Sequence, residues 1–263
     1  MRLIFIRHAE PDYSTDTLTE LGQKEAEALA ERTARWKVDE IFCSPMGRAR
    51  ETAYPTLKAL HMEAAELPWL REFSYPVMHP YQKAKGVAWD LMPQYWTNEP
   101  VMLSRDRWFE APLYRENPDL EKMWYKVCDG LDGILERYGY TRLGDYYDYR
   151  NPDGPERPAG LEDIQLHGTK EYEVRDRDDE KTLVFFCHLG VTCVMLAHLL
   201  NVSPVLLWHG TFLPPAGLVV MNAEKRLHNA AFFRMQAFGD TAHLLQSGVK
   251  LSGYGAFSTV FRD

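Results

Sequence analysis

The chain has 263 residues, of which 45% are hydrophobic and 26% charged, and this is enough apolar material for one large domain or two small ones. Acidic residues outnumber basic residues by 38 to 30, and the resulting formal charge of −8 disfavours sequence-independent binding to nucleic acid or to an anionic membrane surface. Glycine and proline number 17 and 16, ordinary levels that exclude collagen-like and broadly disordered chains.

The cysteines indicate a reducing compartment. They are Cys43, Cys128, Cys187 and Cys193, and no two of them form a C-x-x-C pair. A chain of this size does not need disulfides for its stability. We therefore expect reduced, mostly buried thiols in a cytoplasmic protein.

One long segment is uncharged but does not predict a membrane span. Asp, Glu, Lys and Arg are absent from Thr182 to Ala223, yet the segment contains histidines and several prolines. These residues break it into apolar pieces shorter than the thickness of a bilayer. It is predicted to be the buried centre of the domain, and we expect no membrane partner. The apolar run at Leu3–Ile6 is too short for a signal peptide.

The N-terminal part of the chain predicts a strand, a loop and a helix. Leu3 to Ile6 is apolar without alternation, which favours a strand covered on both faces. A loop is expected around Pro11 to Asp16. Thr19 is a good N-cap residue and predicts a helix that reaches about Trp36.

A second strand and helix follow. Glu40 to Cys43 predicts the strand. Ser44 and Pro45 are typical of a helix start, with serine as the N-cap and proline in the first helical position. This helix is expected to end near Leu60.

The pattern weakens between Phe73 and Asn117, where aromatic residues and prolines accumulate. This segment is too long for a plain loop and predicts an inserted, partly helical cap. Its aromatic residues are expected to form a small core of their own, the alternative being that some of them line a substrate cleft. From Leu120 to Tyr138, apolar residues recur at three- and four-residue steps, which is the clearest helical pattern in the chain.

Residues 139–181 are polar and contain the turn-like sequence Asn151-Pro152-Asp153-Gly154, which predicts a surface hairpin or a mobile loop. Thr182 to Cys187 predicts a buried strand, and a helix to about Leu200 follows it. Two further strands are expected, at Leu218–Met221 and Ala231–Phe238.

Strands that alternate with helices favour the α/β class. We expect a three-layer α/β/α sandwich with a mostly parallel central sheet, formed by a single domain over residues 1–263. The cap at about 73–117 and the loop or hairpin at about 139–181 are predicted to be insertions into this domain.

Polar side chains follow three of the predicted strands. Arg7 and His8 come directly after the first strand, Arg48 lies in the first turn of the helix after the second, and His188 follows the late strand. Ligands of open α/β sheets bind beyond the carboxyl ends of the strands, so we expect these four side chains to converge. Two guanidinium groups, two imidazoles and nearby helix N-termini match a phosphate dianion best.

Four motifs, in this order, resemble the histidine phosphatase (phosphoglycerate-mutase-like) superfamily. They are Arg7-His8-Ala9-Glu10, Leu18-Thr19-Glu20-Leu21-Gly22, Ser44-Pro45-Met46-Gly47-Arg48 and Phe186-Cys187-His188-Leu189-Gly190. The resemblance covers about residues 1–72 and 118–200, and it implies the fold of that superfamily.

The resemblance also implies roles for individual residues. His8 would attack phosphorus and become a phosphohistidine, which requires a neutral imidazole with one nitrogen free. Arg7, Arg48 and a protonated His188 would bind the phosphate oxygens. Glu72 matches the position of the family's general acid, and a raised pKa is expected for it.

Leu189 and Ser14 are further expected phosphate contacts. The chain departs from the family pattern at Ala9, where glycine is usual, and at Pro11, where threonine is common. The Gly-Glu-Ser motif that normally precedes the long helix is missing before Leu120. These departures disfavour ordinary mutase activity, whereas the four-residue phosphate pocket is intact.

The leading hypothesis is a metal-independent phosphatase that acts on a small phosphorylated molecule and needs no cofactor. The alternatives are a phosphoglycerate-type mutase, in which the phosphohistidine returns its phosphoryl group to substrate, and a non-catalytic module that binds phosphorylated ligands. A metal site made of His8, His188 and Glu72 is disfavoured because Arg7 and Arg48 would repel a cation. The sequence leaves the substrate and the oligomeric state open.

Overall fold

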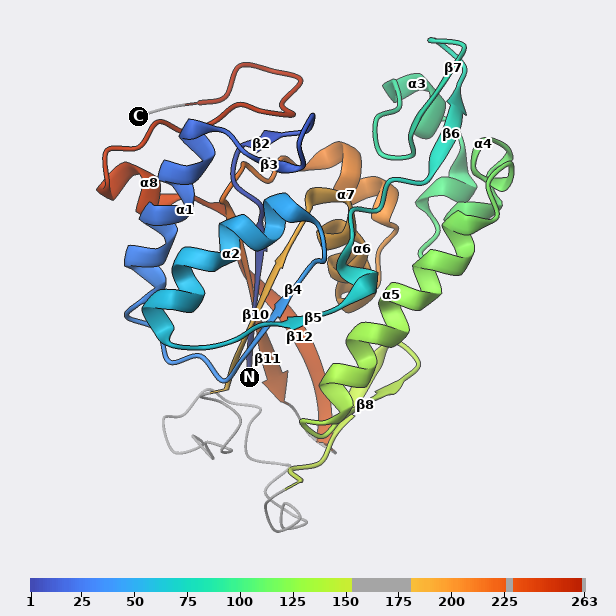
Figure 1. Ribbon diagram of the computed structural model, residues 1–263. Coiled ribbons are helices and arrows are strands. Elements are labelled where there is room, and N and C mark those ends of the chain that lie inside the picture. Colours follow the sequence, from blue (N-terminus) through green and yellow to red (C-terminus); the bar gives the residue numbers. More distant parts are fainter. Residues whose placement is uncertain (153–180, 226–228, 262–263) are drawn as a thin grey trace.

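A computed structural model describes residues 1–152, 181–225 and 229–261. An eight-stranded sheet lies between two layers of helices, with strand order β5-β4-β10-β1-β11-β12-β9-β8 (Figure 1). The strands are β1 (Arg2–Arg7), β4 (Glu40–Cys43), β5 (Ala65–Glu66), β8 (Tyr140–Leu143), β9 (Tyr146–Tyr149), β10 (Thr182–Cys187), β11 (Leu218–Lys225) and β12 (Ala230–Asp240).

The helices cover both faces of the sheet. Helices α1 and α2 lie on one face and α5 and α6 on the other, while α8 packs against α1 (Figure 1). Their bounds, with that of α7, are α1 (Glu20–Thr33), α2 (Gly47–Leu60), α5 (Asp119–Glu136), α6 (Leu189–Leu200), α7 (Pro204–Gly210) and α8 (Ala242–Gln246). None of the helices in the described ranges is long and apolar enough to cross a membrane.

The first strand shows why its sequence is uniformly apolar. Ile4 and Ile6 pack with the helices α1 and α2, whereas Leu3 and Phe5 point to the opposite face and join the larger core under α5 and α6. Both faces of β1 are therefore buried, as the lack of alternation predicts. The four cysteines are free and buried, which also agrees with the prediction.

The sheet is mixed, although the α/β class is confirmed. Strands β5, β4, β10 and β1 are parallel, but β11, β12, β9 and β8 each run antiparallel to their neighbours. The prediction of a mostly parallel sheet therefore holds only for the four strands from β5 to β1. Too few residues separate β11 from β12 for a crossover, so these strands pair as a hairpin.

The hairpin β8–β9 is part of this sheet rather than a surface insertion. Strand β9 pairs with β12, and Tyr140 and Tyr147 are fully buried against the ring of Phe233. The predicted hairpin is present in this part of 139–181, but its expected surface position is wrong, because tyrosines in a polar segment supply core packing. The remainder of that predicted insertion, residues 153–180, lies outside the described residues.

The buried aromatic residues between Phe73 and Asn117 belong to the larger core under α5 and α6, so the expectation of a small core of their own is wrong. Trp108 is fully buried, and its ring contacts those of Phe73, Tyr114 and Trp124. The regular elements here are β6 (Pro76–His79), β7 (Ala84–Val87), α3 (Pro93–Trp96) and α4 (Pro112–Arg115). Most of the large aromatic side chains thus serve packing, and the division into one domain with two insertions stays a prediction.

A buried carboxyl group lies on α1, which ends at Thr33 rather than near Trp36. Glu25 is fully buried; its Oε2 accepts a hydrogen bond of 2.7 Å from the Glu10 backbone N–H, and its Oε1 has no partner in the described part of the chain. Burial raises the pKa of Glu25 to about 7, and the charge of the nearby Glu10 carboxylate acts in the same direction.

Replacement of Glu25 by glutamine should stabilise the protein in a pH-dependent way. Because the folded-state pKa of about 7 exceeds the reference value of 4.5, the wild type loses stability as pH rises between these values. We expect Glu25→Gln to raise the free energy of unfolding by up to ~3 kcal/mol at pH 8 and by less than ~1 kcal/mol at pH 5. Denaturant unfolding at both pH values measures the difference.

Glu27→Gln is the matched control because Glu27 is exposed on the same helix. It should change the unfolding free energy little at either pH. An equal gain from Glu25→Gln at pH 5 and pH 8 would contradict the assignment of a raised pKa to Glu25.

Candidate active site

The pairing of β1 with β10 brings two histidines together. The strands are parallel, and Arg7 lies opposite Cys187, so His8 and His188 leave the sheet at the same level. The His8 backbone N–H donates to the Cys187 carbonyl at 2.9 Å, and the two imidazole centroids are 5.1 Å apart. Residues 180 positions apart in the chain thus become neighbours through strand register alone.

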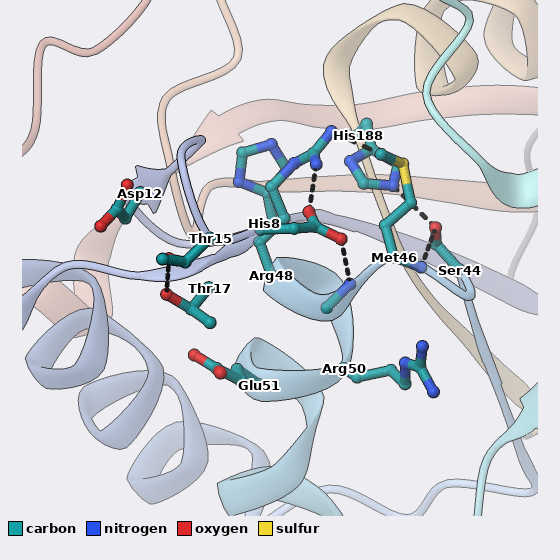
Figure 2. Close-up of polar contacts among 12 residues, drawn as sticks. His8, Asp12, Thr15, Thr17, Ser44, Met46, Arg48, Arg50, Glu51 and His188 are labelled. Carbon is teal, nitrogen blue, oxygen red and sulfur yellow. Dashed lines mark hydrogen bonds and ion pairs between the residues drawn. The ribbon is translucent and has the colours of Figure 1, made fainter.

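The pairing of β4 with β10 adds a serine to this group. The backbone N–H of Ser44 donates to the Phe186 carbonyl at 2.9 Å, and its hydroxyl lies 2.7 Å from Nε2 of His188. The hydroxyl oxygen also accepts a bond from the Met46 N–H. The prediction of Ser44 as a helix N-cap is therefore wrong: α2 begins at Gly47 after Met46, and the serine side chain contacts the histidine instead (Figure 2).

His8 is held as a neutral imidazole with one nitrogen free. The side chain is 1% exposed, and its Nδ1 lies 2.8 Å from the Ala9 carbonyl, to which it donates. No other described side chain or backbone group bonds its Nε2. Burial, with the nearby cations Arg7 and Arg48, holds the pKa of His8 well below its usual range. Nε2 therefore carries a lone pair at neutral pH.

Two buried guanidinium groups flank this imidazole. Arg7 donates to the carbonyls of Leu213, at 2.6 Å, and Tyr254, at 3.4 Å. The guanidinium of Arg48 reaches from the first turn of α2 toward both imidazole rings (Figure 2). The Nε atoms of Arg7 and Arg48 are buried and have no hydrogen-bond partner among the residues described. Unsatisfied buried donors of this kind are what an anion would bind.

Asp16 orients Arg48 and was not identified from the sequence. One carboxylate oxygen accepts from Arg48 and the other accepts from the Gly47 backbone N–H at 2.7 Å. Gly47 is needed for this contact because a Cβ there would lie 2.3 Å from the Asp16 carbonyl oxygen. The loop position of Asp16 carries no periodic signal, so its partner could not be predicted.

His188 differs from the expectation of a protonated side chain. It is fully buried, and burial together with His8, Arg48 and Arg7 holds its pKa well below the usual range. The imidazole is neutral in the absence of an anion. Its Nδ1 is buried and lacks a partner in the described structure, so it is available to a ligand.

Glu72 lies at the N-terminus of α6. Its Oε1 accepts hydrogen bonds from the backbone N–H groups of Phe73, at 2.8 Å, and Val191, at 3.2 Å. Burial raises the pKa of Glu72, although Arg7 and Arg48 lie close enough to oppose this rise. The raised pKa agrees with the expectation from the sequence.

The two remaining predicted contacts lie in different places. Leu189 is the buried first residue of α6 and follows His188 directly. Ser14 is exposed, and its hydroxyl donates to Asp12 at 2.6 Å rather than pointing to the four-residue cluster. The border of the site near this loop is instead Tyr13, whose ring centre is 5.0 Å from the guanidinium carbon of Arg48.

The cluster can bind a dianion and present a nucleophile to it. Arg7, Arg48 and His188 supply donors around the free Nε2 of His8, and Glu72 supplies a carboxyl group whose raised pKa favours the protonated form. Within the described ranges, no group of three or more His, Cys, Asp or Glu side chains is arranged to hold a metal ion.

Comparison with known proteins agrees with this geometry. Residues 3–110 match the family model of the histidine phosphatase superfamily (branch 1). The chain is 40% identical over 67 residues to the probable phosphatase C1687.21 of Schizosaccharomyces pombe, a match that covers 22% of this chain. The chain spans about a third (32%) of the length of this curated relative.

Solved structures share the fold over nearly the whole chain. A phosphoserine phosphatase from Entamoeba histolytica has a TM-score of 0.56 and 17% identity, with 92% of this chain and 98% of that chain covered. A putative alpha-ribazole-5′-P phosphatase from Escherichia coli has a TM-score of 0.53 and 15% identity, with 92% and 98% covered. At these identities the likeness establishes the fold.

Residues 3–110 thus match the histidine phosphatase superfamily, and the fold of the described residues is shared with solved phosphatase structures. The resemblance seen in the sequence is confirmed.

Removal of the Arg48 guanidinium should weaken anion binding. A hydrogen bond to a charged group contributes ~1.5–3 kcal/mol, so Arg48→Ala should raise the Kd for inorganic phosphate by at least about tenfold. Isothermal titration calorimetry at constant ionic strength measures this change.

Arg50→Ala is the matched control on the same helix. Arg50 is exposed, points away from the cluster (Figure 2), and contacts the Pro45 carbonyl and Glu66. The Arg50→Ala substitution removes the same charge but should change the Kd for phosphate less than about twofold. An equal rise in Kd for the two variants would mean that phosphate affinity depends only on overall charge. The assignment of Arg48 to the phosphate site would then be wrong.

Proposed function

We propose that this protein is a metal-independent phosphatase that hydrolyses a small phosphomonoester through a phosphohistidine at His8. The observation that carries the proposal is the tautomer of His8. Its Nδ1–H is fixed on the Ala9 carbonyl, which leaves the lone pair of Nε2 free between Arg7 and Arg48.

In the first step, Nε2 of His8 attacks phosphorus and the bond between phosphorus and the ester oxygen breaks. Arg7, Arg48 and His188 bind the non-bridging oxygens and stabilise their charge. The proton of the Glu72 carboxyl group passes to the departing oxygen. The products are a free alcohol, a phosphohistidine and the Glu72 carboxylate.

In the second step, water attacks the phosphohistidine. The Glu72 carboxylate takes a proton from the water, and the P–N bond breaks. Inorganic phosphate is released, and both His8 and the protonated Glu72 are regenerated. Burial favours the protonated carboxyl group, while Arg7 and Arg48 favour the carboxylate, so Glu72 is suited to exchange a proton in both directions.

Ser44 acts as a positioning residue for His188. In this proposal the Ser44 O–H donates to Nε2 of His188 while its oxygen accepts the Met46 N–H, and the imidazole proton then resides on Nδ1. A neutral His188 is therefore a hydrogen-bond donor to phosphate. A bound dianion also favours protonation of this ring.

The names of similar proteins support the reaction class. They include a phosphoserine phosphatase, a glucosyl-3-phosphoglycerate phosphatase and an alpha-ribazole phosphatase. Each of these substrates is a small phosphorylated molecule, and we extend that class, without choosing a member, to this chain.

The phosphohistidine can be trapped directly. Rapid acid-free quenching during turnover of p-nitrophenyl phosphate, followed by mass spectrometry, should find one acid-labile phosphoryl group on His8. His8→Ala should lose the adduct and at least about 10³-fold in kcat. His198→Gln is the control, because His198 pairs with Asp132 on α5. This variant should retain both the adduct and the wild-type kcat.

The alternatives give other results. Interconversion of 3-phosphoglycerate and 2-phosphoglycerate without net phosphate release would identify a mutase. Equal, slow hydrolysis by the wild type and His8→Ala would favour a non-catalytic module that binds phosphorylated ligands.

The role of Glu72 predicts a dependence on the leaving group. An alkoxide needs a proton as it departs, whereas p-nitrophenolate does not. Glu72→Gln should therefore lower kcat for an alkyl phosphate by about 10²-fold or more, and for p-nitrophenyl phosphate by less than about tenfold. In the wild type, the alkyl phosphate rate should fall as pH rises through the Glu72 pKa, because the acid form is required.

Glu66→Gln provides the control for this experiment, since Glu66 is an exposed carboxylate that pairs with Arg50. It should leave both rates and the pH profile unchanged. If Glu72→Gln lowers the two rates by the same factor, Glu72 does not protonate the leaving group.

A further inference from the structure

A cavity of about 460 Å³ lies next to the proposed phosphate site. Its walls come from residues 89–96 of the cap, residues 208–212 at the end of α7, and residues 255–258 near the C-terminus. In Figure 1 the cap elements α3, β6 and β7 stand beyond the carboxyl ends of the parallel strands, on the side of α6 and α7. The volume is within the range of roughly 300–1,000 Å³ typical of small-molecule pockets.

The cavity is continuous with the phosphate-binding residues at two points. Leu189 lines it and directly follows His188. Gly255 also lines it and lies against Arg7, since a Cβ at Gly255 would be 3.2 Å from a terminal nitrogen of that guanidinium. A phosphoryl group held by Arg7 and His188 therefore has its ester substituent at the cavity mouth.

The third point of contact is the general acid. Glu72 and Trp89 both approach Gly190: a Cβ there would lie 2.6 Å from Oε1 of Glu72 and 2.8 Å from Nε1 of Trp89. The Trp89 indole also donates to the Phe73 carbonyl, one residue after Glu72. The atom that protonates the leaving oxygen thus adjoins the cavity wall, so the cavity is where the leaving group lies.

The lining is apolar and contains no cationic side chain among the described residues. Trp89, Trp96, Trp208 and Phe212 supply aromatic surface. The ionisable lining residues are Asp90 and His209.

His209 offers no positive charge to a ligand. Its Nδ1 donates to the Val205 carbonyl at 2.8 Å, and its Nε2 accepts from the Leu91 N–H at 3.1 Å, so the ring is neutral with both nitrogens occupied. Burial also lowers the pKa of His209. A carboxylate in this cavity would meet the anionic Asp90 and no cationic lining residue, which is unfavourable.

We propose that the leaving group of the substrate is an uncharged, apolar alcohol, aromatic or branched, that packs against Trp89, Trp208 and Phe212. This inference rests on the proposed phosphatase function. It excludes, as preferred substrates, small phosphomonoesters that carry a carboxylate, such as O-phosphoserine and 3-phosphoglycerate.

A series of primary alkyl phosphates tests the proposal. Ethyl phosphate measures the phosphate chemistry alone, 2-phenylethyl phosphate adds an apolar ring, and O-phosphoserine, 3-phosphoglycerate and phosphocholine add charge. Burial of the ring should give 2-phenylethyl phosphate a kcat/KM at least about tenfold above that of ethyl phosphate. The two carboxylated esters should fall at or below ethyl phosphate.

A substitution in the cavity lining tests the same proposal by changing the protein instead of the substrate. Met92 lines the cavity and is 45% exposed, so an arginine is tolerated there. Met92→Arg should raise the ratio of kcat/KM for 3-phosphoglycerate to that for 2-phenylethyl phosphate by about tenfold or more. Met78→Arg is the matched control: Met78 is 41% exposed on β6, outside the cavity lining, and should leave the ratio unchanged.

The outcomes separate the inference from the proposed function. If every ester is hydrolysed and a carboxylated ester or phosphocholine is preferred, the apolar assignment is wrong while the phosphatase function stands. If none is hydrolysed, the proposed function fails, and the cavity is tested by equilibrium binding. In that case 2-phenylethylphosphonate must bind at least about tenfold more tightly than ethylphosphonate, and equal affinities would overturn the inference.

Discussion

The in-register pairing of β10 with both β1 and β4 is the constraint on which the site depends. It places the residues that follow the three strands, His8, His188 and Ser44, at one level. Backbone hydrogen bonds from His8 to Cys187 and from Ser44 to Phe186 continue the ladder beyond the strands. A shift of one residue would turn these side chains to the opposite face of the sheet. The proposed reactive groups are therefore positioned by backbone pairing in the central sheet.

The site concentrates positive charge in a buried place. Arg7 and Arg48 are each 4% exposed, and each retains a buried Nε with no partner within the described residues. Burial of charge with unsatisfied donors opposes folding. Burial, together with these charges, lowers the pKa values of His8 and His188 and keeps the proposed nucleophile, His8, unprotonated. An electrostatic arrangement that is unfavourable in the free protein is thus what prepares it for a dianion.

Elements with a strong local pattern could be predicted from the sequence. The bounds of β4, β10 and α6 agree with those expected, and so does the convergence of the four side chains, because buried strands and the apolar helix after β10 are specified by neighbouring residues. The pairing of the hairpin Tyr140–Tyr149 with β12 was not foreseen, since its burial depends on Phe233, far along the chain. The contacts of Asp16 and Ser44 and the neutrality of His188 also arise only from tertiary neighbours.

The walls of the aromatic cavity have a different origin from the groups around His8. They are built largely from connections between elements and from the segment near residue 255, whereas the reactive groups stand at strand ends and helix starts. Loops tolerate change far better than a sheet does. If the proposed function holds, a change of leaving-group preference therefore requires changes in these peripheral segments only, and the residues around His8 can be kept as they are.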